Sequence, residues 1–155
     1  MRLLFHRGTK VETKKYWKNV IRGPFYVGGE PGTTGISLSA HNNEYQNGTT
    51  LGYHCINDLY EAPETHSHEF HELLCFLGGN PENIDDLGAE IHICLGDDLE
   101  EHIITSATVV TIPPGLKHCP LKVTRITKPF IFLEISTTKE YAQALAASKT
   151  NNPNR

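Results

Sequence analysis

Short apolar runs separated by turn-forming residues are the feature that most limits how this chain can fold. Gly, Pro, Asn and Asp divide the runs, which lie at 36–38, 51–56, 73–77, 89–95, 102–105, 108–112 and 129–135. Runs that recur at this spacing are typical of a β-sandwich or a closed β-barrel. In Glu90–Leu95, aliphatic residues alternate with polar or small ones, which is the period of a half-buried strand. The sequence therefore predicts an all-β protein.

The C-terminal part is the one place where a helical pattern stands out. Thr137-Thr138-Lys139-Glu140 matches a capping box, and helix-forming residues follow it as far as Lys149. A chain of 155 residues has room for one domain with a core of its own. We expect four segments: an N-terminal strand or loop extension (1–40), a barrel (41–136), a short C-terminal helix (137–149) and a frayed tail (150–155).

Composition and charge argue against several classes of protein. Hydrophobic residues make up 38% and charged residues 21% of the chain, which is ordinary for a folded domain. No apolar stretch is long enough to cross a membrane, and no apolar signal segment follows the N-terminus. The net charge of −4 argues against nucleic acid as a partner. We expect a protein that binds neither membranes nor nucleic acids.

The cysteines indicate a reducing compartment. Cys55, Cys75, Cys94 and Cys119 are widely spaced and form no C-x-x-C pair. A domain of this size does not need a disulfide framework, so we expect reduced, mostly buried thiols in a cytoplasmic protein. Cys119 is expected to be a small buried residue and not a nucleophile.

Histidines are concentrated in one segment of the chain. Three of the nine lie between residues 66 and 71. On a strand, His66 and His68 would point to the same face, about 6.6 Å apart, and could converge on one ion. Glu72 has the same parity, whereas His71 has the opposite one. We therefore expect Glu72 to join the two histidines and His71 to lie outside the site.

A fourth candidate ligand follows much later in the chain. Pro113-Pro114-Gly115 predicts a sharp turn, and His118 should begin a new strand that approaches the first histidines from the side. Two other metal motifs fail on spacing. A zincin needs histidines four residues apart on a helix, and His68 and His71 are one residue short of that. No close cysteine pair is present for a zinc finger.

Both segments resemble the conserved motifs of the cupin superfamily. The first motif, G-x5-H-x-H-x3,4-E-x6-G, resembles the segment that contains His66, His68, Glu72 and Gly79. The second, G-x5-P-x-G-x2-H-x3-N, resembles the one that contains Pro113, Gly115 and His118. The resemblance covers residues 60–122. The departures are Tyr60 and Ala107 in place of the leading glycines and Lys122 in place of the final Asn, and none of these positions is a ligand.

The resemblance implies a cupin-like double-stranded β-helix, or jelly-roll, barrel. Cupin relatives include dioxygenases, isomerases, epimerases, decarboxylases and lyases, so the resemblance names no single reaction. Three imidazoles and one carboxylate suit one divalent transition metal: Fe, Mn, Ni, Co or Zn. A divalent ion with one carboxylate ligand keeps a charge of about +1, which favours a small anionic or oxygen-rich ligand.

We expect an enzyme, with dioxygenase-type chemistry first and isomerase or lyase chemistry second. A non-catalytic sensor of small molecules or metals is the alternative. Catalytic residues are not assigned by the sequence. Whether Glu90, His92, His54 or Glu134 lines the pocket is left open, and Glu134 could serve as a base if it faces inward.

The chain is also expected to form a homodimer. Open barrels expose edge strands, and pairing between copies is a common way to cover them. Tyr16, Trp17, Phe25 and Tyr26, in the N-terminal extension, could supply an apolar contact surface.

Overall fold

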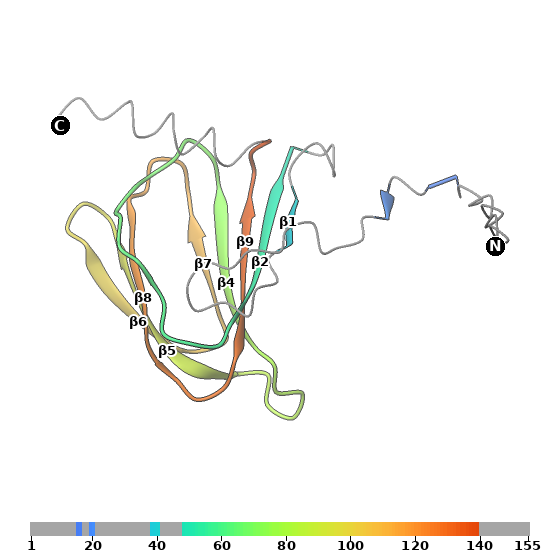
Figure 1. Cartoon of the computed structure of the whole chain (residues 1–155). Coiled ribbons are helices and arrows are strands. Elements are labelled where there is room, and N and C mark those ends of the chain that lie inside the picture. Colours follow the sequence, from blue (N-terminus) through green and yellow to red (C-terminus); the bar gives the residue numbers. More distant parts are fainter. Residues whose placement is uncertain (1–14, 17–18, 21–37, 41–47, 140–155) are drawn as a thin grey trace, which may run out of the picture.

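The computed structural model describes residues 15–16, 19–20, 38–40 and 48–139 (Figure 1). Within them the chain forms β1 (Leu38–Ala40), β2 (Thr50–Ile56), β3 (Glu61–Ala62), β4 (Glu72–Gly78), β5 (Asp86–Leu95), β6 (Glu100–Ser106), β7 (Thr108–Ile112), β8 (His118–Ile126) and β9 (Phe130–Ser136). The predicted helix over 137–149 lies outside the described residues from residue 140 onward, and residues 137–139 are not helical. The predicted tail over 150–155 and most of the N-terminal extension also lie outside them.

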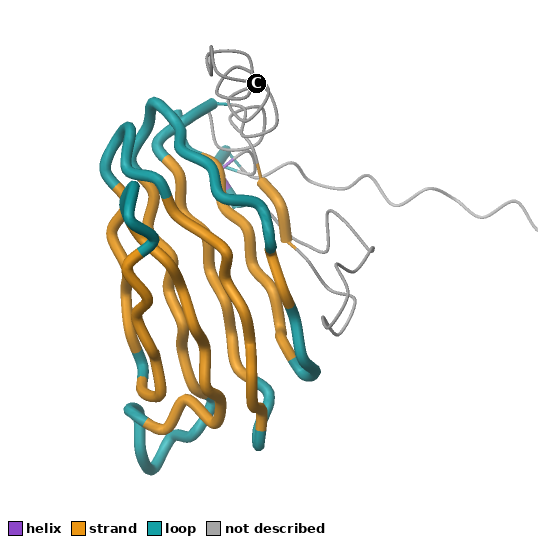
Figure 2. The backbone as a smooth tube through the Cα atoms, turned by 90° about the vertical axis from the view of Figure 1, so that its left-hand side faces the viewer, coloured by secondary structure: helices purple, strands orange, loops and turns teal. Residues whose placement is uncertain are grey.

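The strands form two antiparallel sheets that face each other. One sheet has the order β1-β2-β9-β4-β7 and the other the order β3-β8-β5-β6. Figures 1 and 2 show the two layers running side by side, with the connections at their ends. The described part of the chain contains no helix long and apolar enough to cross a membrane. The all-β, cupin-like double-stranded β-helix expected from the sequence is confirmed.

Strand β9 lies in the middle of its sheet and determines what faces the interior. Its alternate residues Phe130, Phe132 and Ser136 are buried, and Glu134 is half-buried on the same side. Ser136 is opposite Thr50 on β2 and Glu72 on β4, while Glu134 is opposite Gly52 and Leu74. Polar side chains therefore fill one end of the barrel interior.

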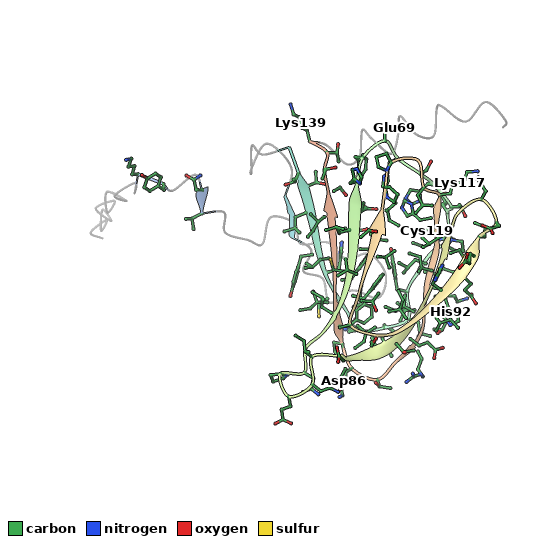
Figure 3. All side chains as sticks on the ribbon, turned by 180° about the vertical axis from the view of Figure 1, so that it is seen from behind. Glu69, Asp86, His92, Lys117, Cys119 and Lys139 are labelled. Atoms are coloured by element: carbon green, nitrogen blue, oxygen red, sulfur yellow. The ribbon has the colours of Figure 1, made fainter. Side chains whose placement is uncertain are left out.

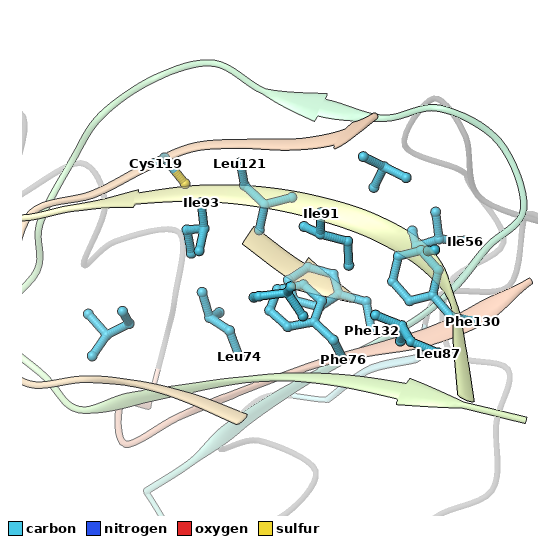
Figure 4. Packing of buried hydrophobic residues seen from close by; sticks show 14 residues of the cluster. Ile56, Leu74, Phe76, Leu87, Ile91, Ile93, Cys119, Leu121, Phe130 and Phe132 are labelled. Atoms are coloured by element: carbon cyan, nitrogen blue, oxygen red, sulfur yellow. The ribbon is translucent and has the colours of Figure 1, made fainter. Parts of the chain in front are cut away.

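Apolar side chains fill the rest of the interior. Phe76 on β4 and Phe132 on β9 stack with ring centroids 5.0 Å apart. Figure 4 shows Ile91, Ile93 and Leu121 from the second sheet pointing toward Leu74 and the phenylalanines of the first. Fully burying one such side chain stabilises a fold by about 1.5–3 kcal/mol. This apolar packing holds the two sheets together beneath the polar end.

Most strands coincide with the predicted apolar runs, and β8 begins at His118 as expected. The two-residue strand β3 was not anticipated, because two residues are too few to show a period. Leu38–Ala40, which was assigned to the N-terminal extension, pairs with β2. The four cysteines are free thiols.

Candidate metal centre

His66 and His118 are held together by their own backbones. The His66 N–H donates to the His118 carbonyl at 3.0 Å, and the His118 N–H donates to the His66 carbonyl at 2.9 Å. This single antiparallel bridge places the two imidazoles side by side, with ring centroids 4.3 Å apart. The bridge thus brings His66 and His118, which are 52 residues apart in the sequence, into contact.

His68 reaches the same place from a loop, which corrects the expectation that His66 and His68 share a continuous strand. Pairing stops after His66, and β4 begins only at Glu72. The Gly115 N–H donates to the His68 carbonyl at 2.8 Å, and Gly115 has a φ of 80°, a conformation that favours glycine. The ring of Phe70 stacks on the His68 imidazole with centroids 3.9 Å apart. The hydrogen bond from Gly115 and the stacked ring of Phe70 therefore hold His68 in place, where strand pairing was expected to do so.

The three imidazoles converge. One nitrogen from each of His66, His68 and His118 lies within 4.8 Å of those of the other two. His68 is 1% exposed and His118 is 2% exposed, so both rings are removed from water. Buried histidines need partners or a ligand, because an unsatisfied buried polar group is costly.

The outward nitrogen of each imidazole faces a backbone carbonyl. Nδ1 of His66 lies 2.9 Å from the Glu64 oxygen, Nδ1 of His68 3.2 Å from the Phe70 oxygen, and Nδ1 of His118 3.1 Å from the Leu116 oxygen. A carbonyl oxygen can only accept a hydrogen bond, so each Nδ1 must donate. In the neutral ring this leaves Nε2 as the acceptor. All three histidines are thus set in the tautomer in which Nε2 can bind a metal.

The Nε2 atom of His66 differs from the other imidazole nitrogens of this group. It is buried and has no hydrogen-bond partner in the described part of the chain. A buried, unsatisfied nitrogen costs about 1–3 kcal/mol unless something binds it. The buried Nε2 atom therefore supports a bound ligand at His66, and this support is independent of the sequence motif that contains His66 and His68.

The carboxylate of Glu72 lies beside two of the three imidazoles. It is the first residue of β4 and is 1% exposed. One carboxylate oxygen, Oε2, lies 3.1 Å from Nε2 of His68 and 3.6 Å from Nε2 of His118. The other, Oε1, accepts a hydrogen bond of 2.8 Å from the Ser136 hydroxyl. Ser136 therefore fixes the rotation of the carboxylate while Oε2 points at the imidazoles.

The ionisation of these groups follows from their surroundings. Burial raises the pKa of Glu72, but hydrogen bonds from His68 and Ser136 and the nearby imidazoles outweigh it, so the net shift is downward. Burial lowers the pKa of His118 to about 4, the hydrogen bond to Leu116 opposes this, and His66 adds to it. At neutral pH the site therefore holds an ionised carboxylate beside a neutral His118.

These donors fit a divalent cation. With each Nδ1 donating outward, Nε2 of a neutral ring can only accept, as the Glu72 carboxylate does, so these atoms need a proton or a cation between them. A cation among them satisfies the nitrogens, including Nε2 of His66, and neutralises Glu72. Imidazole nitrogen and carboxylate oxygen are ligands that suit several divalent transition metals and do not select one.

A cavity of about 70 Å³ adjoins the histidines. It is lined by Tyr60, Ala62, His66, Glu72, Leu74, His118, Cys119, Leu121, Phe132 and Glu134. Glu134 therefore faces inward, which the sequence left open. His54, on β2, is half-buried, and its Nε2 lies 3.1 Å from Oε2 of Glu134.

Other residues considered in the sequence lie elsewhere. His71 is exposed, and its N–H donates to Oγ1 of Thr137 at 3.1 Å. His92 lies on the outer face of β5, because its neighbours Ile91 and Ile93 are 0% exposed and point inward (Figure 3). There it contacts Glu90 and Glu101 and does not line the cavity.

Cys119 is buried between the two sheets beside His118 (Figure 3). Burial, with a smaller effect from Glu134 and Glu72, raises the pKa of its thiol to about 12. A protonated thiol is a poor nucleophile, which agrees with the structural role expected for this residue. Sequence reasoning missed Ser136 and Phe70. The only available signal for Ser136 was its place in the alternation Phe130, Phe132, Glu134, Ser136.

No protein-family model matches the sequence, and no match was found among curated proteins. Solved structures do match. Peruvianin-I, a cysteine peptidase from Thevetia peruviana latex, aligns with a TM-score of 0.56 and 14% identity over 88% of this chain and 84% of its own. An oxalate oxidase aligns with a TM-score of 0.53 and 9% identity over 86% and 65%. A pumpkin seed globulin aligns with a TM-score of 0.52 and 11% identity over 79% and 30%.

The chain thus spans less than a third of the globulin and most of peruvianin-I. At identities this low, the likeness is one of fold. The structural neighbours are cupin-type proteins, in agreement with the motifs at residues 60–122.

Proposed function

We propose that this cupin-fold chain is an enzyme that uses one divalent transition metal on His66, His68, Glu72 and His118. The observation that supports it best is the buried Nε2 of His66, which has no partner among the described residues. One nitrogen of each of the three histidines lies within 4.8 Å of those of the other two, and Oε2 of Glu72 lies 3.1 Å from Nε2 of His68 and 3.6 Å from Nε2 of His118. A purely structural role would not require a polar atom to be buried without a partner.

Each residue has a distinct task in this proposal. The carbonyls of Glu64, Phe70 and Leu116 hold the three rings in one tautomer. Ser136 keeps the Glu72 carboxylate turned toward the imidazoles. When bound, the metal (Fe, Mn, Ni, Co or Zn) would supply Lewis acidity and a template for a small oxygen ligand.

Two reaction classes remain candidates. The structural likeness to an oxalate oxidase supports oxygen-dependent chemistry, within which dioxygenase-type chemistry is the first proposal. The inward-facing carboxylate of Glu134 supports the second, an isomerase or lyase, because such reactions need a group that takes or gives a proton. The alternative function is a non-catalytic sensor that binds a small molecule at the metal.

One experiment separates these proposals. The metal-stripped protein is reconstituted with Fe²⁺, Mn²⁺ or Zn²⁺ and incubated with small hydroxy, oxo and amino acids. Oxygen uptake is followed with an electrode, and products are followed by proton NMR. Uptake that His118→Ala abolishes supports the dioxygenase class, and product without uptake supports an isomerase or lyase. Tight ligand binding without product supports the sensor, and a protein that binds no metal contradicts all three.

A further inference from the structure

A second carboxylate shares the cavity with the histidines. Glu134 lies on the inner side of β9 and lines the same cavity as His66, Glu72 and His118. Its side chain is 32% exposed, so it is partly shielded from water. None of the three imidazoles is its hydrogen-bond partner. It is therefore a separate feature of the cavity.

His54 and Gly52 hold this carboxylate in place. Nε2 of His54 donates to Oε2 of Glu134 at 3.1 Å, and the His54 ring lies against Phe132 with centroids 5.8 Å apart. Gly52 is opposite Glu134 on β2. A Cβ at position 52 would lie 2.9 Å from Oε2 of Glu134 and 3.0 Å from Nε2 of His54. The glycine thus leaves the space that this pair occupies.

The two oxygens of the Glu134 carboxylate have different surroundings among the described residues. Oε2 accepts from His54, whereas Oε1 has no hydrogen-bond partner within the described residues. Ionised carboxylates accept several hydrogen bonds, and those from charged donors are the strongest. The open oxygen can therefore receive a donor from a ligand in the cavity.

Glu134 also changes the charge that a ligand meets. A divalent ion with Glu72 leaves about +1, as the ligand set alone suggests. Adding the Glu134 carboxylate brings the cavity to about zero, with the positive charge at the histidine end and the negative charge at Glu134. A dianion is then disfavoured. A ligand that is neutral overall, with opposite charges at its two ends, is favoured.

The cavity also limits the size of the ligand. One water needs about 10–15 Å³ of such space, so about 70 Å³ holds roughly five waters or a molecule of about five to seven non-hydrogen atoms. Its walls between the two charged ends are apolar, from Leu74, Leu121 and Phe132. The middle of the ligand should therefore be a short hydrocarbon chain.

We propose that Glu134 is a specificity-determining residue and that the cavity binds a small amino acid-like zwitterion. The carboxylate of the ligand lies toward the histidine end, and its ammonium group donates to Glu134. His54 and Gly52 position the Glu134 carboxylate. This inference rests on the proposed metal site, because the metal supplies the positive end of the cavity.

The test uses β-alanine and butyrate, which have the same chain and carboxylate and differ in an ammonium group against a methyl group. Each is titrated into zinc-loaded protein at pH 8 by calorimetry, and zinc is quantified in the same samples. Wild-type protein should bind β-alanine about tenfold more tightly than butyrate, as expected for a charge-assisted hydrogen bond. Glu134→Gln should lose that preference and keep its zinc, and it should bind butyrate at least as tightly as the wild type, because a negative charge has left the cavity. Glu90→Gln, on the outer face, is the matched control and should behave as wild type.

Gly52→Ala gives a second route if Glu134→Gln folds poorly. Its added Cβ displaces the His54–Glu134 pair and should reduce the preference for β-alanine without loss of zinc. Equal affinities of the zinc-loaded wild type for the two probes, or a preference that survives in Glu134→Gln, would overturn the role of Glu134 and leave the metal site standing. Failure of the wild type to bind zinc would overturn both.

Discussion

Two histidine–glutamate clusters lie on opposite sides of the same barrel wall, and they differ in the partner of the second imidazole nitrogen. On the outer face, Nδ1 of His92 lies 3.1 Å from Glu101 and Nε2 lies 3.4 Å from Glu90. In the interior, each Nδ1 donates to a backbone carbonyl, and the Nε2 atoms converge.

The difference decides what each cluster can bind. Carboxylates on both sides of His92 favour its protonated form: the hydrogen bond to Glu101 raises its pKa, burial opposes this, and the hydrogen bond to Glu90 adds to the increase. Its hydrogen-bonding capacity is therefore filled. Backbone carbonyls donate no proton and carry no full charge, so each interior ring donates from Nδ1 and keeps Nε2 directed inward, and His118, with its lowered pKa, stays neutral. Residue type is the same in both places, and the surroundings make only the interior cluster a candidate metal site.

The largest effect is expected from removing an interior histidine. His68→Ala or His118→Ala should weaken metal binding by more than the roughly 10–100-fold that loss of a ligand's supporting partner usually costs. His92→Ala and His71→Ala should bind metal as the wild type does, because neither ring contacts the interior group. Calorimetric titration of the stripped proteins with Co²⁺ measures this. Equal loss in His71→Ala or His92→Ala would show that the ligand set is assigned incorrectly.

The two clusters should respond to pH with opposite signs. His118 has a pKa of about 4 in the folded protein against about 6.5 unfolded, so its contribution to stability is present above pH 6.5 and is lost as pH falls toward 4. The lowered pKa of Glu72 acts in the same direction at lower pH. The raised pKa of His92 gives stability that is present below pH 6.5 and is lost as pH rises through its folded value.

Bound metal should enlarge the acid loss, because protons compete for the same Nε2 atoms. At 100 times the dissociation constant, free metal adds about 2.7 kcal/mol to stability near neutral pH. Melting curves with metal and with chelator, from pH 8 to pH 5, measure the difference. A gap that stays constant over this range would argue against histidine ligation.

A smaller effect is expected from two matched hydroxyl groups. Ser136 donates to Glu72 inside at 2.8 Å, and Thr124 donates to Glu90 outside at 3.0 Å. Ser136→Ala should weaken metal binding by about tenfold, since supporting hydrogen bonds orient ligands. Thr124→Ala should leave it unchanged. The same Co²⁺ titration measures both affinities. If Ser136→Ala binds metal as tightly as the wild type, Glu72 does not depend on the hydrogen bond from Ser136.

The smallest expected effect concerns the outer surface. We propose that the chain forms a homodimer, since β6 and β7 end their sheets and expose Ile103 and Val109, at 59% and 53%. Light scattering should then give twice the mass of 17.3 kDa for one chain. A mass of one chain at all concentrations would contradict the dimer and leave the metal site unaffected.

Local patterns predicted much of the fold and the composition of the site. The alternation in residues 90–95 and the turn at 113–115 placed β5 and the start of β8 correctly, because periodicity and proline act within a few residues. The expectation that His66 and His68 share one strand was wrong. Phe70 and Gly115 hold His68 instead, and Gly115 is far from it in the sequence.

Long-range register explains what the sequence could not reveal. The roles of Ser136, His54 and Glu134 depend on which residues β9 pairs with on β2 and β4. A shift of one residue would turn Glu134 outward, and nothing within β9 alone excludes that shift. The inner or outer position of His92 depended in the same way on which face of β5 is buried.

We propose that the interior Nε2 atoms hold one metal ion per chain. Elemental analysis of the purified full-length protein tests it directly, with His118→Ala prepared in parallel. We predict about one equivalent of a single divalent transition metal in the wild type and little in the variant. Less than about a tenth of an equivalent in the wild type after metal is supplied, or equal content in the two proteins, would contradict the claim.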